Sequence, residues 1–396
     1  MGAGLRLLLA TMCGVAVASV YVAQPILPEM SRQFGMSADS AGRFIAVGQL
    51  GYLAGLVLLV PLGDVVDRRR VIVIHLALLA AGLGVVACAD AEWMALGGLA
   101  AAGIFAVVVQ IIVAYAATLS TPQMRGRDLG VVTSGVVIGI IGSRVVSGFL
   151  TDMWGWRSVY AVLAIVSAIL AVAAALRLAD DRRSSRVRYA DVLANLGRLF
   201  VEPRFLQRGL IAFFLFASFD TLWSGMASAL SADPWQLSET SIGLFGIAGL
   251  AGALGAAGAG RWADAGYAAR VTGVALVVLV VSWALIGRLA SSLVVLIIGV
   301  IILDFAVEAV HVSNQHILTS FYADRASAVL GAYMVFYSLG SALGASGTTA
   351  LFGALGWTAS VMLGAAFAVA GLLTWVIAEL TTHSAKHRSP ERLPHL

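Results

Sequence analysis

Pro61-Leu62-Gly63-Asp64-Val65-Val66-Asp67-Arg68-Arg69-Arg70 is a charged turn between two long hydrophobic stretches, and it decides how the rest of the chain is interpreted. A second charged turn begins with Arg261-Trp262-Ala263-Asp264 and ends at Arg270. Asp264 and Arg270 each lie 200 residues after their counterparts, Asp64 and Arg70. A charged hairpin that occurs twice at one spacing predicts two related halves in a single chain.

The composition indicates a membrane protein. Hydrophobic residues make up 60% of the 396 residues, charged residues only 12%, and the mean hydropathy is +0.94. Apolar stretches of about 20 residues cross a bilayer as helices, which satisfy their own backbone hydrogen bonds in lipid. Cys13 and Cys88 lie in apolar stretches and indicate neither a disulfide framework nor a metal site. The first apolar stretch has no small-residue cleavage site, so we interpret it as a retained helix.

The hydropathy pattern predicts an all-α integral membrane protein with twelve transmembrane helices in two pseudo-symmetric six-helix bundles. An N-terminal bundle over residues 1–178 is expected to contain helices near 7–29, 40–62, 71–90, 93–119, 128–150 and 157–178. A C-terminal bundle over 208–380 is expected to contain helices near 208–231, 239–262, 270–289, 292–319, 327–351 and 357–380. Residues 179–207 are too polar to span and are predicted to form a cytoplasmic linker, and 381–396 a cytoplasmic tail.

The distribution of basic residues predicts that both termini are cytoplasmic. With that orientation, Arg144 lies inside a span, 20 of the 25 basic residues are cytoplasmic, and the outer loops hold only Arg32, Arg43, Arg157 and Arg288. This bias is the one that sets the orientation of membrane proteins. The pI near 9.3 then reflects arginines beside anionic lipid headgroups, and no nucleic-acid partner is expected.

The internal repeat extends beyond the charged turns. Ser37-Ala38-Asp39-Ser40-Ala41-Gly42 matches Ser238-Glu239-Thr240-Ser241-Ile242-Gly243 at an offset of 201, and both are plausible helix starts. Gly155-Trp156 matches Gly356-Trp357 at the same offset. Two parallel halves with a binding site between them at mid-membrane are typical of transporters.

Over essentially its whole length the chain resembles the major facilitator superfamily. The loop between the second and third helices of that family usually reads Gly-x-Leu-Ala-Asp-Arg-x-Gly-Arg-Arg, and here Asp64 stands at its Asp and Arg68-Arg69 at its basic pair. Val60, Val65 and Asp67 replace the first Gly, the Arg and the second Gly. The resemblance implies that Asp64 caps a helix of the other half and latches the cytoplasmic side shut in the outward-facing state. We therefore expect a gating role for Asp64, Arg68, Arg69, Asp264 and Arg270.

Two further stretches are similar to a bacterial subgroup near the drug:proton antiporters. They are Tyr21-Val22-Ala23-Gln24-Pro25-Ile26-Leu27-Pro28 and Leu303-Asp304-Phe305-Ala306-Val307-Glu308, the latter continuing to Val312-Ser313-Asn314-Gln315. A Gln is usual in that subgroup where Glu308 stands, and Asp220 is unusual. Both departures add acid to the core.

The helix expected over 128–150 resembles the antiporter signature of spaced glycines. It carries Gly130, Gly135, Gly139, Gly142 and Gly148, but Ser143-Arg144 stands where the signature has a Gly-Pro pair. Close packing against a neighbouring helix is an alternative explanation of these glycines.

Ionisable groups inside the predicted spans are costly in lipid and therefore mark the candidate site. Asp304, Glu308, His311 and Gln315 follow one another at i, i+4, i+7 and i+11, so they share one helix face. Asp220 and Arg144 lie in two other spans. Burial favours a protonated carboxylate and a nearby guanidinium favours an ionised one. We expect Asp220, Asp304 and Glu308 to handle protons and cations with Arg144 as their charge partner; a permanent Arg–Asp pair that only holds the halves together is the alternative.

His311 is expected either to relay protons or bind substrate, or to be simply hydrogen-bonded on the cavity wall. The expected substrate contacts are aromatic and amide side chains that suit an amphipathic solute, namely Tyr21, Gln24, Gln110, Tyr115, Trp223 and Gln315. Gln110 aligns with His311 at the repeat offset, so the two are expected to face each other across the cavity. Packing is the alternative role for Tyr21, Gln24 and Trp223.

Enzyme motifs are missing from the sequence: there is no phosphate-binding loop, no His-Glu-x-x-His and no Gly-x-Ser-x-Gly. Transport must then be driven by a gradient. The sequence favours a secondary transporter of the bacterial inner membrane, without cofactor or metal, that exchanges protons for a small amphipathic or cationic organic compound. A monomer in contact with lipid is expected. The alternatives are a proton symporter importing a nutrient, a uniporter, and a non-transporting receptor or scaffold on the same fold.

Overall fold

A computed structural model of the chain describes residues 1–37, 40–121, 124–180, 189–255, 262–322 and 326–387. The regular structure described there is helical. The N-terminal group of helices comprises α1 (Ala3–Tyr21), α2 (Ala23–Gln33), α3 (Gly42–Leu58), α4 (Leu62–Val65), α5 (Arg68–Ala87), α6 (Glu92–Ala106), α7 (Val108–Leu119), α8 (Arg125–Trp154) and α9 (Trp156–Arg177). After α10 (Tyr189–Leu199), the C-terminal group comprises α11 (Pro203–Ser231), α12 (Glu239–Gly255), η2 (Ala263–Tyr267), α14 (Ala268–Ile286), α15 (Leu293–Phe321), α16 (Ala326–Leu355) and α17 (Trp357–His387).

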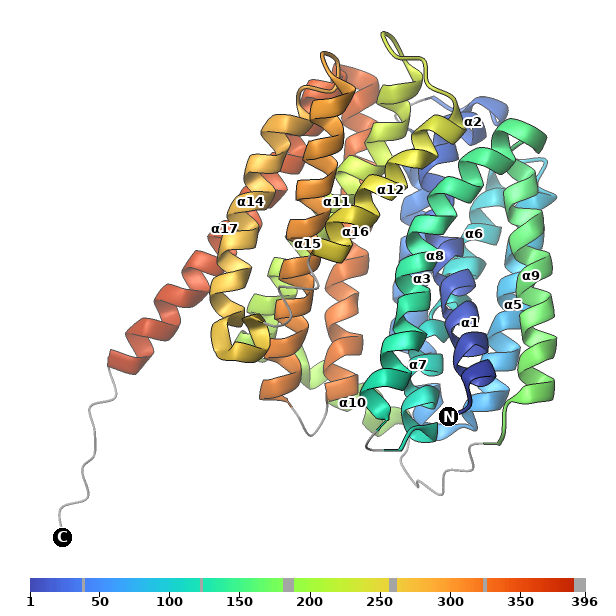
Figure 1. Cartoon of the computed structure of the whole chain (residues 1–396), viewed down its shortest axis with the longest axis vertical. Coiled ribbons are helices and arrows are strands. Elements are labelled where there is room, and N and C mark those ends of the chain that lie inside the picture. Colours follow the sequence, from blue (N-terminus) through green and yellow to red (C-terminus); the bar gives the residue numbers. More distant parts are fainter. Residues whose placement is uncertain (38–39, 122–123, 181–188, 256–261, 323–325, 388–396) are drawn as a thin grey trace.

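The helices have the lengths and composition of membrane spans. In the described part of the chain, ten are long and apolar enough to cross a bilayer, and α3 is a shorter apolar helix. The helix α12 has 17 described residues before the undescribed segment 256–261. The prediction of an all-α, twelve-helix membrane fold is confirmed, and Figure 1 shows the two groups side by side.

Two predicted spans are broken at their centres. The stretch expected as one helix over 7–29 forms α1 and α2, which meet at Val22. Pro25 has no N–H to bond the carbonyl of Tyr21 and its ring crowds that carbonyl, so the ladder is interrupted there. The break brings Gln24 to the middle of the molecule, where its side chain is buried. The span expected over 93–119 is likewise split at Val107, between α6 and α7.

The linker is more structured than its polarity predicted. Residues 189–199 form the amphipathic helix α10, and α11 begins at Pro203, five residues before the expected start at 208. Proline is favoured at the first helical position because its missing N–H has no partner there in any case. Leu199 and Phe205 are buried together with Tyr322 and Tyr333, which fixes the linker helix to the C-terminal group. The exact domain boundaries remain a prediction.

The glycines of α8 serve mainly close packing. A Cβ at Gly135 would lie 2.1 Å from the Ala10 carbonyl oxygen of α1, and one at Gly139 would lie 2.2 Å from the Gly14 carbonyl oxygen. A Cβ at Gly148 would lie 2.2 Å from the carbonyl oxygen of Glu239 in α12, whereas Gly130 and Gly142 face open space. Close helix packing therefore accounts for three of the five glycines of the proposed signature.

The two groups contact each other chiefly at one end of the molecule. We call this end, where α8 turns into α9 at Gly155, the far side; the terminal side carries the N-terminus, α10 and the end of α17 (Figure 1). The most extensive contacts between the groups join α3 to α16 and α8 to α12. On the far side a Cβ at Gly42 would lie 2.7 Å from the Ala345 carbonyl oxygen, and Asp152 accepts a hydrogen bond from the Thr240 N–H at 2.9 Å. The far side is therefore closed.

Candidate functional site

A chain of buried polar groups joins the two halves at mid-membrane. Arg144 of α8 donates from Nε to Gln24 Oε1 of α2 at 3.0 Å, and Gln24 donates from Nε2 to Asp220 Oδ1 of α11 at 2.8 Å. All three residues are buried, with Asp220 fully removed from solvent. One amide thus links the guanidinium of one half to the carboxylate of the other.

Trp223 of α11 makes a second link. The Arg144 guanidinium carbon lies 3.5 Å from the centroid of the Trp223 ring, with the Tyr21 and Phe219 rings at 5.6 and 5.7 Å. The indole Nε1 of Trp223 donates to Asp304 Oδ1 of α15 at 3.2 Å. Arg144 is therefore connected to both carboxylates through an intermediary, an amide for Asp220 and an indole for Asp304.

No direct ion pair joins Arg144 to a carboxylate within 4.0 Å among the described residues. The described part of the structure therefore does not contain the direct Arg–Asp ion pair of the alternative interpretation. Arg144 Nη2 and Asp220 Oδ2 are buried without a hydrogen-bond partner. Because unsatisfied buried charges are costly, these two atoms are the ones a proton, water or ligand would satisfy.

A glycine face on α12 makes room for this cluster. Gly243, Gly246, Gly249 and Gly252 recur every third residue; a Cβ at Gly243 would lie 2.4 Å from the Arg144 carbonyl oxygen, and one at Gly249 would lie 2.3 Å from Asp304 Oδ2. Sequence reasoning missed this face, although the Gly-x-x-Gly spacing was a visible signal.

A small cavity adjoins the cluster and is lined by Arg144, Phe219, Gly249, Asp304 and Glu308, with three apolar residues of α8. Its volume is about 40 Å³. Since roughly 10–15 Å³ holds one water molecule and ligand sites measure about 300–1,000 Å³, it has room for water but not for an organic solute. Glu308 is half-buried at its wall, and no described residue makes a hydrogen bond or ion pair with it.

His311 and Gln315 continue the polar stripe of α15 toward α16. Gln315 Nε2 lies 2.8 Å from His311 Nε2, and His311 Nδ1 lies 3.2 Å from the hydroxyl oxygen of Tyr333. Because the amide nitrogen donates, His311 Nε2 accepts and Nδ1 carries the proton toward Tyr333. Phe216 packs edge-on against His311 with ring centroids 5.2 Å apart. The hydrogen-bonded role expected as one alternative for His311 fits this geometry.

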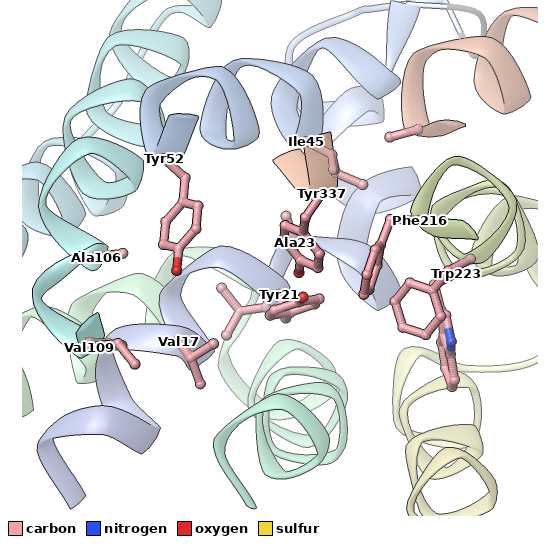
Figure 2. Close-up of a cluster of buried hydrophobic side chains, with 14 of the residues drawn as sticks. Val17, Tyr21, Ala23, Ile45, Tyr52, Ala106, Val109, Phe216, Trp223 and Tyr337 are labelled. Carbon is pink, nitrogen blue, oxygen red and sulfur yellow. The ribbon is translucent and has the colours of Figure 1, made fainter. Parts of the chain in front are cut away.

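Aromatic side chains surround the centre. Figure 2 shows Tyr21, Phe216 and Tyr337 close together between the two groups, with Trp223 beside them. The ring centroids of Phe216 and Tyr337 are 4.1 Å apart. Both residues were missed in the sequence because an aromatic residue in an apolar helix carries no spacing signal of its own.

Gln110 and Tyr115, both predicted to contact substrate, make hydrogen bonds outside the central cluster. Gln110 Nε2 donates to the Tyr52 hydroxyl at 3.4 Å within the N-terminal group, and His311 bonds within its own group. That the two residues face each other across the cavity stays a prediction. Tyr115 donates to the Ala179 carbonyl oxygen at 2.9 Å, at the terminal end of α7. The structure does not bring Tyr115 to the central cluster.

Three of the residues predicted to act in gating have described side-chain contacts. Arg68 donates to the carbonyl oxygens of Gly63 and Ala114 at 2.9 and 3.2 Å, and Arg69 pairs with Asp180 at 2.5 Å. The Arg270 guanidinium lies 5.6 Å from the Tyr267 ring. The side chains of Asp64 and Asp264 lie outside the described part of the structure.

In the described part of the chain, the membrane helices form two groups and charged side chains of both groups meet between them, an arrangement typical of membrane transporters. The model of the Major Facilitator Superfamily matches residues 9–232 and 209–395. Accordingly, the chain belongs to the Major Facilitator Superfamily and is a secondary transporter.

Its relatives agree with this assignment. The chain is 38% identical over 372 residues to the putative uncharacterized transporter YgaY of Escherichia coli (strain K12), with 94% of each chain covered. It is 30% identical to the probable transporter SCO4007 of Streptomyces coelicolor, covering 95% of this chain and 86% of the relative.

Solved structures share the fold. A bacterial homolog of the human lysosomal transporter Spinster, in an inward-facing and occupied conformation, superposes with a TM-score of 0.75 at 16% identity, covering 98% of this chain and 97% of the other. The nucleoside transporter NupG (D323A mutant) superposes with a TM-score of 0.77 at 13% identity, covering 94% and 98%.

Proposed function

We propose that the protein is a proton-coupled antiporter that works by alternating access and exports a small amphipathic or cationic organic compound. The observation that carries this proposal is the central cluster, where one buried guanidinium of the N-terminal group is linked to two buried carboxylates of the C-terminal group. With Glu308 the cluster holds three acids, Asp220, Asp304 and Glu308, against one base. That balance favours protons and cations over anions.

The proton step follows from competition for the same carboxylates. Burial disfavours an ionised carboxylate, and a neighbouring guanidinium or a bound cation favours it. A substrate cation that enters the cluster therefore releases a proton, and a proton that binds releases the cation. In this scheme Asp220 and Asp304 exchange proton for substrate, Glu308 receives protons from the cavity, and His311 with Gln315 lines the way to the terminal side.

The proposed setting is the inner membrane of a bacterium, with both termini in the cytoplasm and the protein acting as a monomer. The bias of basic residues toward the terminal side supports this orientation. The closed far side then corresponds to an inward-facing state. Opening the far side and closing the terminal side, with a latch role for Asp64, completes the transport cycle.

The test is ethidium flux in proteoliposomes. In exchange with protons, ethidium accumulates in vesicles whose lumen is acidic, whereas a symporter accumulates it when the outside is acidic. The double variant Asp220→Asn/Glu308→Gln is expected to lose the effect of the pH gradient. Asp90→Asn, which neutralises an exposed carboxylate of the α5–α6 turn, is the matched control and is expected to keep it.

Each part of the proposal has an outcome that contradicts it. Gradient-driven flux in the double variant with unchanged pH dependence refutes the assignment of the proton sites. Wild-type flux that does not respond to a pH gradient refutes proton coupling itself, and ethidium accumulation only with an acidic exterior refutes antiport.

A further inference from the structure

The Arg144 side chain covers the aromatic face of Trp223 in the central cluster. Its guanidinium stacks on the face of Trp223 at 3.5 Å, and Tyr21 and Phe219 flank it at under 6 Å. The guanidinium is a flat, delocalised and weakly hydrated cation, which is why Arg stacks on aromatic faces better than Lys does. In shape and charge it is the same kind of group as the head of a planar organic cation.

The groups around Arg144 form a site for such a cation. An aromatic face with two further rings and a nearby carboxylate attracts organic cations. Trp223 supplies the face and fixes Asp304 beside it through the indole hydrogen bond of 3.2 Å. Asp220 contributes a carboxylate oxygen, Oδ2, that is buried and has no hydrogen-bond partner. The surroundings of Arg144 therefore have the chemistry that would recognise an external cation.

Among the described residues, the Trp223 face that Arg144 covers has no room for that cation while Arg144 is in place. The adjoining cavity of about 40 Å³ is too small for an organic solute, and α12 closes tightly over the Arg144 stem, since a Cβ at Gly246 would lie 3.2 Å from Arg144 Cβ. An organic cation reaches the face of Trp223 only if the guanidinium leaves it.

We infer that Arg144 is a tethered competitor for the cation site, and that a planar organic cation binds by displacing its guanidinium from Trp223. This inference rests on the proposed function, because it names the part of the cluster that a transported cation would take. The specificity-determining pair is Arg144 with Trp223, one residue from each half. Displacement therefore removes a contact that holds the two halves together.

The displaced guanidinium has an acceptor close by. Glu308 lines the same cavity as Arg144, and no hydrogen bond or ion pair to its carboxylate is formed in the described part of the chain. A guanidinium that turns from Trp223 to Glu308 exchanges an aromatic contact for a charge-assisted hydrogen bond. Glu308 thereby lowers the cost of displacement, and Glu308→Gln is expected to weaken cation binding without touching the aromatic face.

The test is a double-mutant cycle with ethidium, a planar aromatic cation, titrated into purified full-length protein in detergent. The four proteins are wild type, Arg144→Gln, Trp223→Leu and the double variant. Arg144→Gln is expected to lower the Kd for ethidium about tenfold, which is about 1.4 kcal/mol and lies within the range of a desolvated cation–π contact. In the W223L background the same change is expected to lower the Kd by less than about threefold, because the contested face is gone.

Controls separate competition from a simple change of net charge. Arg144→Lys keeps the charge but stacks poorly, so it is expected to give part of the gain. Phenanthridine has the same ring system without the quaternary charge, so it does not respond to a change of net charge. Competition for the Trp223 face therefore predicts that Arg144→Gln tightens phenanthridine binding when Trp223 is present and not in the Trp223→Leu background. Each variant is first confirmed to be monodisperse by gel filtration, and the Lys variant provides a second measurement if the Gln variant does not fold.

Two results overturn the inference. If Arg144→Gln raises the affinity for ethidium equally in the presence of Trp223 and in the Trp223→Leu background, only net charge matters. If Arg144→Gln binds ethidium more weakly than wild type, Arg144 contacts the ligand instead of competing with it. The flux assay tests the proposed function separately. If the double-mutant cycle gives the expected result but the protein shows no gradient-driven flux, Arg144 competes for the cation site and proton antiport is rejected. If gradient-driven flux is present but the cycle fails, proton antiport stands and competition by Arg144 is rejected.

Discussion

Asp152 is predicted to stabilise the closed far side from the end of α8. Its Oδ2 accepts the backbone N–H of Thr240 at 2.9 Å, and Thr240 is the second residue of α12, so a carboxylate of one half caps a helix of the other. A carboxylate at a helix N-terminus contributes about 0.5–1 kcal/mol where it is exposed, as Asp152 is. Because the contact joins the two halves on the far side, it is expected to be lost when that side opens. Asp152→Ala is therefore expected to raise the ratio of far-side-open to far-side-closed molecules about two- to fivefold.

The assay is a spin-label distance measurement across the far side. Labels at Asp90 and Ser291, exposed positions in the loops of the two groups, report its opening, after replacement of the exposed Cys88 and the buried Cys13. Asp152→Asn keeps the acceptor oxygen and loses only the charge, so it is expected to shift the ratio less than Asp152→Ala. An unchanged distance distribution for Asp152→Ala in a well-folded protein would refute the prediction that Asp152 stabilises the closed far side.

Three further predictions follow from contacts in the core. Gly249→Ala is expected to reduce flux at least tenfold, because its Cβ would meet Asp304 Oδ2 at 2.3 Å, whereas Gly142→Ala faces open space and leaves flux unchanged in the same assay. Gln24→Leu is expected to lower the melting temperature by several degrees and to reduce flux, because the amide alone bridges Arg144 Nε and Asp220 Oδ1. Gln24→Glu can still pair with Arg144 but cannot donate to Asp220, so a comparison of the two variants separates the contributions of the two hydrogen bonds. Arg68→Gln is expected to lower thermal stability in detergent by about 1–3 kcal/mol, since the buried guanidinium satisfies two backbone carbonyl oxygens, and an unchanged melting curve would contradict this.

The membrane fold followed from composition because lipid imposes one demand on every span. A stretch of about 20 apolar residues that bonds its own backbone is readable from the chain alone. The break at Val22 was also readable in principle, since Pro25 removes a backbone donor within the stretch. The helix α10 was not, because eleven residues with one apolar face acquire their partner only when Leu199 meets Phe205 in the folded protein.

The candidate site was predicted in part. The i, i+4, i+7 spacing fixed the shared face of Asp304, Glu308 and His311, because helix geometry alone determines which side chains align. The intermediaries that connect Arg144 to the carboxylates depend on which helices become neighbours. That Gln24 bonds Asp220, or that Trp223 stands between Arg144 and Asp304, is a tertiary fact with no local signature.

The helix α8 joins the central cluster to the contact between Asp152 and Thr240 on the far side. Arg144, Gly148 and Asp152 follow at four-residue intervals on α8, and each meets the C-terminal group: Arg144 at Trp223 and Gly243, Gly148 at Glu239, and Asp152 at Thr240. Arg144 and Asp152 are about 12 Å apart along the helix axis at 1.5 Å per residue. A regular helix does not stretch, so α8 moves both residues together.

The shared helix makes the two contacts energetically dependent. If α8 separates from α12 as a rigid element, the stack of Arg144 on Trp223 and the cap of Asp152 on α12 are lost in the same movement. Whatever weakens the stack in the centre then lowers the cost of opening the far side by the same amount, because a ligand shifts a conformational equilibrium only by its differential affinity for the two states. An organic cation that takes the place of Arg144 on Trp223 would act on the gate through α8, without contacting any residue of the far side.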